Sequence, residues 1–252
     1  MGRALRGVGV GLLGVVAAVV IGSSAGGVAA QEAAIDAPIA DPLSGGSRPE
    51  QFLLFAGVDL WHASVANYAG LHWAPAGLHN DGVFARLLLS RNFERYGATS
   101  TIIFRGALLG GVRFKRGGFE VKLMAGPELE NADPTSPFDQ LRGTRLGLQA
   151  AAETWWQPTP ELLLATSLTL TAHGNGNGYG GRVAAGWRLL DQAWIGPEAS
   201  AFSDHYSTQY RVGLHVTGLR VEGLEWSAAA GYLEDGFARR GGYGRIGMLL
   251  RQ

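Results

Sequence analysis

The residues that could do chemistry are few, and their spacing does not favour a reaction. Ser203, Asp204 and His205 are consecutive and are the three residue types of a hydrolytic triad. Consecutive side chains on an extended chain point apart, so these three cannot make the contacts of nucleophile, base and orienting acid. No two histidines have metal-ligand spacing with a carboxylate on the same face. The six are His62, His72, His79, His173, His205 and His215. We therefore predict no catalytic, cofactor-binding or metal-binding residues, and no cofactor.

Two further segments have the composition of ligand-binding loops. Glu128, Glu130, Asp133 and Asp139 could ligate a calcium ion, but acidic clusters of this kind are usually solvated, and we expect a solvated acidic loop. The sequence GNGNG at 174–178 lacks the Lys-Ser/Thr pair and the helix of a phosphate loop, so we expect a hairpin turn.

Composition excludes several classes of protein. The chain has 252 residues with 39 Gly, about twice the average glycine usage, and only 17% of its residues are charged. It contains no Cys, which excludes a disulfide framework, thiol catalysis and a thiolate metal site. The formal net charge is zero and no block of Lys or Arg is present, so nucleic acid is not an expected partner.

The first thirty residues have the order of a secretory signal peptide. Arg3 and Arg6 precede an uncharged apolar run over 8–21, and small residues lead to Ala30. This run of 14 residues is short for a membrane-spanning helix, and the small residues form a cleavage site, which disfavours an uncleaved anchor. We predict a cleaved signal peptide over 1–30, with the mature chain outside the cytoplasm.

The next twenty residues form a separate segment. Residues 31–50 are rich in Ala, Pro, Asp, Gly and Ser and show no sustained period. Such a segment cannot bury enough apolar area to offset its ordering entropy. We predict a flexible periplasmic leader over 31–50 and one barrel domain over 51–252.

Residues 51–252 alternate strand-length segments with turn residues. Over 162–171, leucines alternate with Ala, Ser and Thr, which is the pattern of a strand with one apolar face. No uncharged apolar run approaches the ~20 residues of a membrane helix. We therefore predict an all-β fold, an antiparallel up-and-down transmembrane β-barrel of about 12 strands. The predicted strands are 51–61, 65–75, 82–92, 99–113, 118–127, 142–156, 161–172, 179–189, 193–203, 207–217, 223–233 and 241–251.

The connections between these strands differ at the two ends of the barrel. Links after even-numbered strands are mostly short, such as KRGG at 115–118 and QPTP at 157–160. Links after odd-numbered strands are longer, for example HGNGNG at 173–178 and ELENADPTSPFDQL at 128–141. Short turns at one end and longer polar loops at the other are typical of an outer-membrane barrel. We predict that the mature chain lies in the outer membrane of a Gram-negative bacterium, with the long loops outside the cell and both termini in the periplasm.

The two faces of the predicted strands differ in charge. One face is uncharged, with Leu148, Leu168 and Leu214 among its members, and we predict that it contacts lipid. The opposite face carries the charged residues that we assign to the barrel interior, as structural or pore-lining groups. These are Asp59, Arg86, Glu120, Lys122, Arg145, Glu153, Arg182, Arg188, Glu198, Arg211, Glu225 and Arg245. A soluble barrel with an apolar inside would show the same two faces, so the faces alone leave that alternative open.

The charges assigned to the interior are nearly balanced, with seven basic and five acidic side chains. An excess of one sign would bias conduction toward the opposite ion, whereas balance favours a cross-linked ion network. We predict a largely occluded lumen.

Aromatic residues fall into two bands, which is the pattern of the interfacial girdles of a membrane barrel. The predicted girdle near the short-turn end consists of Trp73, Trp156, Trp187, Trp194 and Trp226. The band near the long-loop end consists of Tyr96, Tyr179, Tyr206, Tyr210, Tyr232 and Tyr243. Ordinary core aromatics would not separate by end, so this pattern favours lipid as the medium around the barrel.

Several runs of the sequence resemble the BcsS-like family of cellulose biosynthesis proteins. They include FAGVDLWHASVANYAGLHWAPAGLHNDG, AGPELE, LRGTRLGLQAAAETWWQPTP and AAGWRLLDQAWIGPEASAF, and the resemblance covers essentially all of 52–248. That family comprises secreted bacterial proteins associated with cellulose production and considered outer-membrane barrels. The resemblance implies a non-enzymatic role at the cell surface and supplies no catalytic residues.

Three functions follow as hypotheses. The first is an accessory outer-membrane barrel of cellulose biosynthesis or export, with membrane lipid and either cellulose or the cellulose synthase and export machinery as partners. The second is a small channel for ions or saccharides, whose interior charges set selectivity. The third is a lipid- or glycan-modifying enzyme, which would need a Ser/His/acid cluster near one rim.

Overall fold

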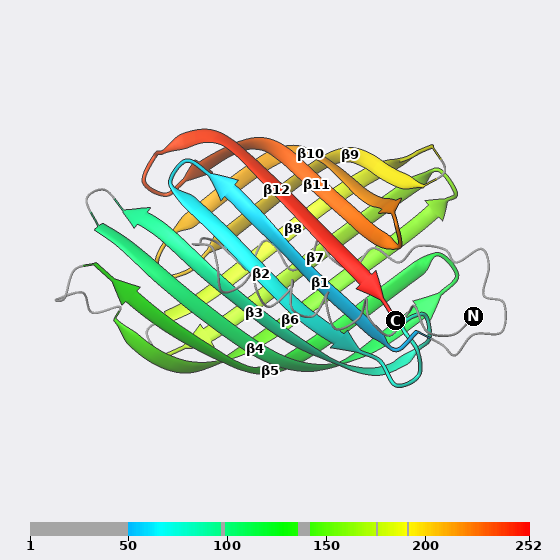
Figure 1. Cartoon of the computed structure of the whole chain (residues 1–252), viewed down its shortest axis with the longest axis horizontal. Helices are drawn as coiled ribbons and strands as arrows, with labels where there is room; N and C mark the ends of the chain where they lie inside the picture. The colour runs from blue at the N-terminus through cyan, green and yellow to red at the C-terminus, as the bar shows by residue number, and fades with distance from the viewer. Residues whose placement is uncertain (1–49, 97–98, 136–141, 175, 191) are drawn as a thin grey trace.

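The computed structural model is a closed barrel of antiparallel β-strands (Figure 1). It describes residues 50–96, 99–135, 142–174, 176–190 and 192–252. Within these ranges there are twelve strands; each pairs with its neighbours in sequence, and β12 pairs with β1 to close the ring. Closure leaves no unpaired strand edge. The prediction of an all-β, twelve-stranded, antiparallel barrel is confirmed.

The strands follow one another along the chain. They are β1 (Phe52–Trp61), β2 (Ser64–Trp73), β3 (Gly82–Tyr96), β4 (Thr99–Arg116), β5 (Phe119–Pro134), β6 (Gly143–Thr159), β7 (Leu162–His173), β8 (Gly176–Leu189), β9 (Ala193–Ser203), β10 (Thr208–Val221), β11 (Leu224–Asp235) and β12 (Arg240–Arg251).

The two ends of the barrel domain meet at one end of the barrel. The backbone N–H groups of Gln51 and Phe52 both donate to the Gln252 carbonyl at 2.8 Å. We call this the terminal end, and we call the opposite end the distal end. The predicted signal peptide over 1–30 lies outside the described residues, and so does the predicted leader except for Glu50. Among the described residues, no helix is long and apolar enough to cross a membrane.

The predicted long loops at the distal end are wrong over much of their length. β5 continues to Pro134, and its residues Leu129 and Glu130 pair with Gly106 and Arg105 of β4. β8 begins at Gly176, so most of the glycine-rich run belongs to a strand. The apolar–polar alternation of Glu128, Leu129 and Glu130 continues the strand pattern, and pairing on both sides of β5 outweighs the turn-forming residue types.

The alternation of side chains gives the barrel an apolar outside. Leu146, Leu148, Leu168 and Leu214 are exposed by 72%, 65%, 47% and 62%, although leucine is normally buried in a soluble protein. Their neighbours on the same strands alternate with them and face the lumen, where charged and apolar side chains are both buried. The lumen is therefore the place where this chain concentrates its polar groups.

Candidate functional site: the barrel lumen

The structure buries most of the twelve charged residues that the sequence assigns to the interior. Ten of them are buried, with exposures from 1% at Asp59 to 8% at Glu153. Arg145 is only partly buried. Arg188 is exposed at the terminal end of β8, where its guanidinium lies 5.2 Å from the ring centroid of Trp194.

Ion pairs join strands that are not neighbours in the sheet. Arg86 of β3 donates to Glu153 of β6 at 2.6 Å, and these two strands are three positions apart around the ring. Arg211 of β10 donates to Asp59 of β1, which is again three positions away. Such contacts pass through the space enclosed by the strands, so they cross-link the wall of the barrel from inside.

Glu198 is the centre of a second group of contacts. Its carboxylate accepts from Arg182 of the neighbouring strand at 2.6 Å and from Arg245 of β12 at 2.8 Å. The Tyr243 hydroxyl donates to the same carboxylate at 2.8 Å. Three donors compensate this buried charge, which would otherwise be costly to remove from water.

The lumen also contains an apolar core, which the sequence analysis did not predict. Lumen-facing side chains of β1 to β6, together with one from β12, form a buried cluster with two side chains of the β2–β3 loop. The cluster consists of Leu53, Phe55, Tyr68, Ala74, Leu78, Phe84, Leu88, Ala107, Leu109, Met124, Ala151 and Leu249. Close packing of this kind fills the interior in the way that a soluble core is filled.

The β2–β3 loop, residues 74–81, folds into the terminal end of the lumen, and we call it the terminal loop. Leu78 is 7% exposed within the apolar cluster. Its backbone N–H donates to the Glu50 carbonyl at 2.7 Å, and its carbonyl accepts from the Arg113 guanidinium. Arg113 in turn lies 3.2 Å from Glu120, so the loop is tied to the ion network.

The β9–β10 turn, residues 204–207, folds into the distal end, and we call it the distal turn. Asp204 accepts from Arg105 of β4 at 2.8 Å, and the Tyr206 hydroxyl donates to Glu130 of β5 at 2.8 Å. Arg105 also donates to Glu130 at 2.9 Å. β4 lies five positions from β9 around the ring, so the turn reaches across the lumen to the opposite wall.

The conformation of the distal turn is set by Asp204. Its second carboxylate oxygen accepts from the backbone N–H groups of Tyr206 and Ser207 at 2.8 and 2.9 Å, which is an Asx-type turn. The turn presents the Tyr206 ring to Ile103 and Ala132, with which it forms a small buried cluster. Burial and then the negative charge of Glu130 raise the pKa of the Tyr206 hydroxyl above the ordinary tyrosine value, so it remains a hydrogen-bond donor further into the alkaline range.

Two histidines lie beside buried carboxylates at the distal end of the lumen, each beside a different one. His205 Nε2 lies 3.2 Å from Glu130 Oε1, and His173 Nε2 lies 3.6 Å from Glu128 Oε2. The predicted solvated acidic loop is wrong for Glu128 and Glu130, which are buried at 4% and 0% exposure. Asp133 of that segment is exposed and pairs with Arg142, and Asp139 lies outside the described residues.

The arrangement at the distal turn is not that of a hydrolase. The Ser203 hydroxyl contacts the Thr208 hydroxyl at 2.8 Å, while His205 lies against Glu130 and Asp204 against Arg105. Within the described residues, no group of three or more His, Cys, Asp or Glu side chains could hold a metal ion. What these residues do is position a turn.

One tryptophan of the predicted girdle lies on the wrong face. Trp194 is 3% exposed and packs with Trp155, Leu163 and Ala165 in the lumen. The prediction placed Trp194 near the short-turn end of the barrel. Side chains alternate between the two faces along a strand, and Ile195 points outward, so Trp194 points into the lumen. Trp73, Trp156 and Trp187 are exposed by 43%, 45% and 55%, and Trp226 is half-buried.

The tyrosine band also divides between the two faces. Tyr179, Tyr210 and Tyr232 are exposed, whereas Tyr206 and Tyr243 are buried and donate to Glu130 and Glu198. The predicted girdle position is therefore wrong for these two, because a tyrosine hydroxyl can serve a buried carboxylate as well as a membrane interface.

The fold resembles those of solved outer-membrane barrels. The COG4313 outer membrane channel from Pseudomonas putida F1 matches 85% of this chain and 100% of its own chain, at 8% identity and a TM-score of 0.52. The translocator domain of the autotransporter NalP from Neisseria meningitidis matches 82% of this chain and 90% of its own, at 14% identity and a TM-score of 0.47. No match was found among curated proteins. At such identities the likeness concerns the fold alone, and it defines this chain as a barrel of the outer-membrane type.

The family follows from a different comparison. The family model of the cellulose biosynthesis protein BcsS matches residues 53–252, which is the whole barrel domain except its first two residues. The chain belongs to this family, as the resemblance of its sequence runs indicated.

Proposed function

We propose that this protein is a non-enzymatic accessory barrel of bacterial cellulose biosynthesis or export, located in the outer membrane after cleavage of a signal peptide. The observation that carries the proposal is the filled lumen. Ion pairs such as Arg86–Glu153 span it, and a loop folds into each of its ends. A barrel filled in this way acts through its surfaces, as a scaffold that anchors or organises the polymer or its machinery.

The family supports the link to cellulose, and the fold supports the link to membrane lipid. Deletion of the gene should lower the amount of cellulose retained at the cell surface, and a plasmid copy should restore it. Unchanged cellulose production and retention in the deletion strain would count against the accessory role.

Location is tested separately. Membrane fractionation and protease shaving of intact cells should place the mature chain in the outer membrane with both termini protected in the periplasm. Recovery of the protein in the soluble periplasmic fraction would contradict the proposal.

A second candidate is a small channel, and the distal turn favours it. This turn is held by hydrogen bonds and ion pairs, which can exchange partners, and its movement would open one end of the lumen. Single-channel conductance of the refolded protein in planar bilayers decides between the two functions. We expect no steady open state, and a large steady conductance would replace the scaffold with the channel.

A further inference from the structure

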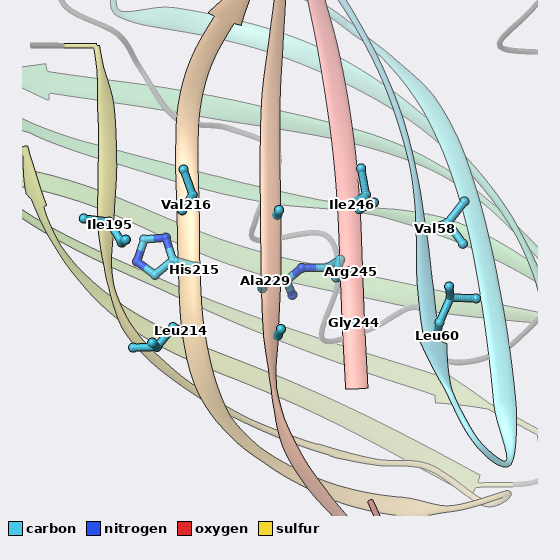
Figure 2. Close-up of a pocket in the computed structure, with 12 residues that line it drawn as sticks. Val58, Leu60, Ile195, Leu214, His215, Val216, Ala229, Gly244, Arg245 and Ile246 are labelled. Carbon is cyan, nitrogen blue, oxygen red and sulfur yellow. The ribbon is translucent and has the colours of Figure 1, made fainter. Parts of the chain in front are cut away.

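The outer wall of the barrel carries a furrow where β11 presents small side chains. Its floor consists of Ala228 and Ala230 on β11 and Gly244 on β12, and its volume is about 410 Å³. Figure 2 shows Ile195, Leu214 and Val216 on one side of it and Val58, Leu60 and Ile246 on the other. Volumes of this size hold small-molecule ligands in other proteins.

Register explains why a furrow forms at this place. Leu214 pairs with Ala230, and Ala230 pairs with Gly244, so a large outward side chain on β10 is followed by two small ones on the next strands. Leu60 pairs with Gly244 on the other side. Strands are ~4.8 Å apart, so the strands that carry Leu214 and Leu60 lie about 14 Å apart, which leaves room for a hydrocarbon chain between the two side chains.

The furrow continues toward the distal end along β12. A side-chain carbon added to Gly244 would meet no atom within 4 Å, and one added to Gly242 would meet only a backbone oxygen at 3.8 Å. Arg240 follows on the same outward face, four residues from Gly244 or about 14 Å along the strand. An open apolar path therefore leads from the furrow to a guanidinium group.

Arg240 lies at the level expected for lipid headgroups. Tyr232, which is 48% exposed, pairs with Gly242 on the neighbouring strand, and outward tyrosines mark the membrane–water interface of barrels. Arg240 lies beyond this tyrosine, and its present partner is the exposed carboxylate of Glu234 at 2.9 Å. Exposed ion pairs contribute little to stability, so the guanidinium can exchange Glu234 for another anion.

We propose that this furrow binds one acyl chain of a phosphorylated, anionic lipid, and that Arg240 contacts its phosphate. An aliphatic furrow suits the hydrocarbon chain, and the planar guanidinium suits the phosphate oxygens, to which it can donate two parallel hydrogen bonds. Glu234 competes with the phosphate for Arg240 and weakens lipid binding. The inference rests on the proposed location in a lipid bilayer and goes beyond the proposed accessory role.

The test uses the full barrel domain in nanodiscs of phosphatidylcholine containing phosphatidylglycerol. Heat-dependent gel mobility first establishes insertion, and failure at this step contradicts the membrane location rather than the lipid site. Native mass spectrometry then measures which lipid stays bound after extraction. We expect phosphatidylglycerol to be enriched over phosphatidylcholine on the unsubstituted protein.

Three variants separate the parts of the site. Arg240→Gln should lower the preference for phosphatidylglycerol by about tenfold, which is the loss of one charge-assisted contact. Glu234→Gln should raise that preference. Gly244→Leu should lower the retention of both lipids, because its side chain fills the furrow.

Matched controls lie on other parts of the same surface. Gly110 on β4 is outward and also has open space for a side chain, so Gly110→Leu should leave lipid retention unchanged. Arg116→Gln at the terminal end removes a comparable exposed pair, with Asp81, and should also have no effect. Equal retention of the two lipids, or equal losses in the controls, would overturn the proposal. A dimer that disappears in Gly244→Leu would assign the furrow to a second copy of the chain instead.

Discussion

The two ends of the lumen are closed by different chemistry. The distal turn is held by the buried guanidinium of Arg105, which pairs with the carboxylates of both Glu130 and Asp204. The terminal loop inserts Leu78 into an apolar cluster, and hydrogen bonds from Arg113 to the Leu78 carbonyl and from the Leu78 N–H to the Glu50 carbonyl hold its backbone. Closure by the distal turn depends on the pairing of its buried charges. Closure by the terminal loop depends on how well its buried apolar side chain fills the space around it. The two ends should therefore respond to different substitutions.

The two ends also differ in which side chains stay paired and which become exposed to water when each end opens. Withdrawal of the distal turn leaves Arg105 paired with Glu130 on the opposite wall, because these two residues are neighbours in the sheet. Withdrawal of the terminal loop exposes Phe84 and Leu109 to water. The free-energy cost of this exposure grows with the apolar area exposed. The distal end is therefore the easier one to open, and the terminal end is the more permanent seal.

Removal of the cation at the distal turn should have the largest effect. Arg105→Leu leaves Glu130 and Asp204 without their shared donor, and breaking a buried ion pair costs about 3 to 5 kcal/mol. Urea unfolding in lipid vesicles measures the loss. The matched control is Arg142→Leu, whose exposed pair with Asp133 should be worth about 0 to 1 kcal/mol. Similar losses in the two variants would show that the distal turn is not held by Arg105.

A cavity in the terminal loop should have the next largest effect. Leu78→Ala removes buried apolar volume and should cost about 2 to 5 kcal/mol. Leu190→Ala is the control, because Leu190 is 82% exposed in the β8–β9 link and its substitution should change stability little.

Conductance measurements test the comparison in another way. Neither the Arg105→Leu variant nor the Leu78→Ala variant should conduct, since each substitution leaves one end of the lumen closed. A steady open state in either single variant would contradict closure at both ends.

A charge on the outer wall should disturb neither closure directly. Leu168→Arg places a cation on the lipid face and should cost about 2 to 4 kcal/mol if the site lies near the bilayer midplane. Ser167→Arg, one residue away, places it in the lumen between Glu153 and Arg182, its partners in the register. The lumen position should be milder, as measured by folding into lipid vesicles. Equal losses would mean that the surroundings of the barrel are not apolar.

Strand number and face could be predicted because they depend on local alternation. The leucines of β6, β7 and β10 alternate with charged or small residues, and this period of two identifies both the strands and their outward faces. Strand ends could not be predicted where polar residues continue the alternation. β5 runs through Glu128 and Glu130 because its neighbours supply partners, and these partners are distant in sequence.

The lumen was harder to predict than the wall. Arg105 and Arg113 lie on the same face of β4 as Ile103 and Leu109. The inward face of this strand is therefore partly apolar, and polarity alone does not show which face of β4 points into the lumen. The distal turn was missed because its contacts join residues 76 and 99 positions apart. A local signal did exist, because Asp204 precedes Tyr206 with the spacing of an Asx turn. This spacing predicts the shape of the turn but not the residues that it contacts across the lumen.

The smallest effect should come from the Tyr206 hydroxyl. Tyr206→Phe leaves Glu130 paired with Arg105 and should cost about 1 kcal/mol at neutral pH. Because burial and Glu130 raise the pKa of Tyr206, its contribution is fully present below the ordinary tyrosine pKa of about 10 and is lost as pH rises through the folded value. The difference in unfolding free energy between the two proteins should therefore shrink above pH ~10. Tyr210→Phe, at an exposed position on the outer face, is the control for the loss of a tyrosine hydroxyl elsewhere. A difference that stays constant into alkaline pH would mean that the hydroxyl does not hold the distal turn, and closure there would rest on Arg105 alone.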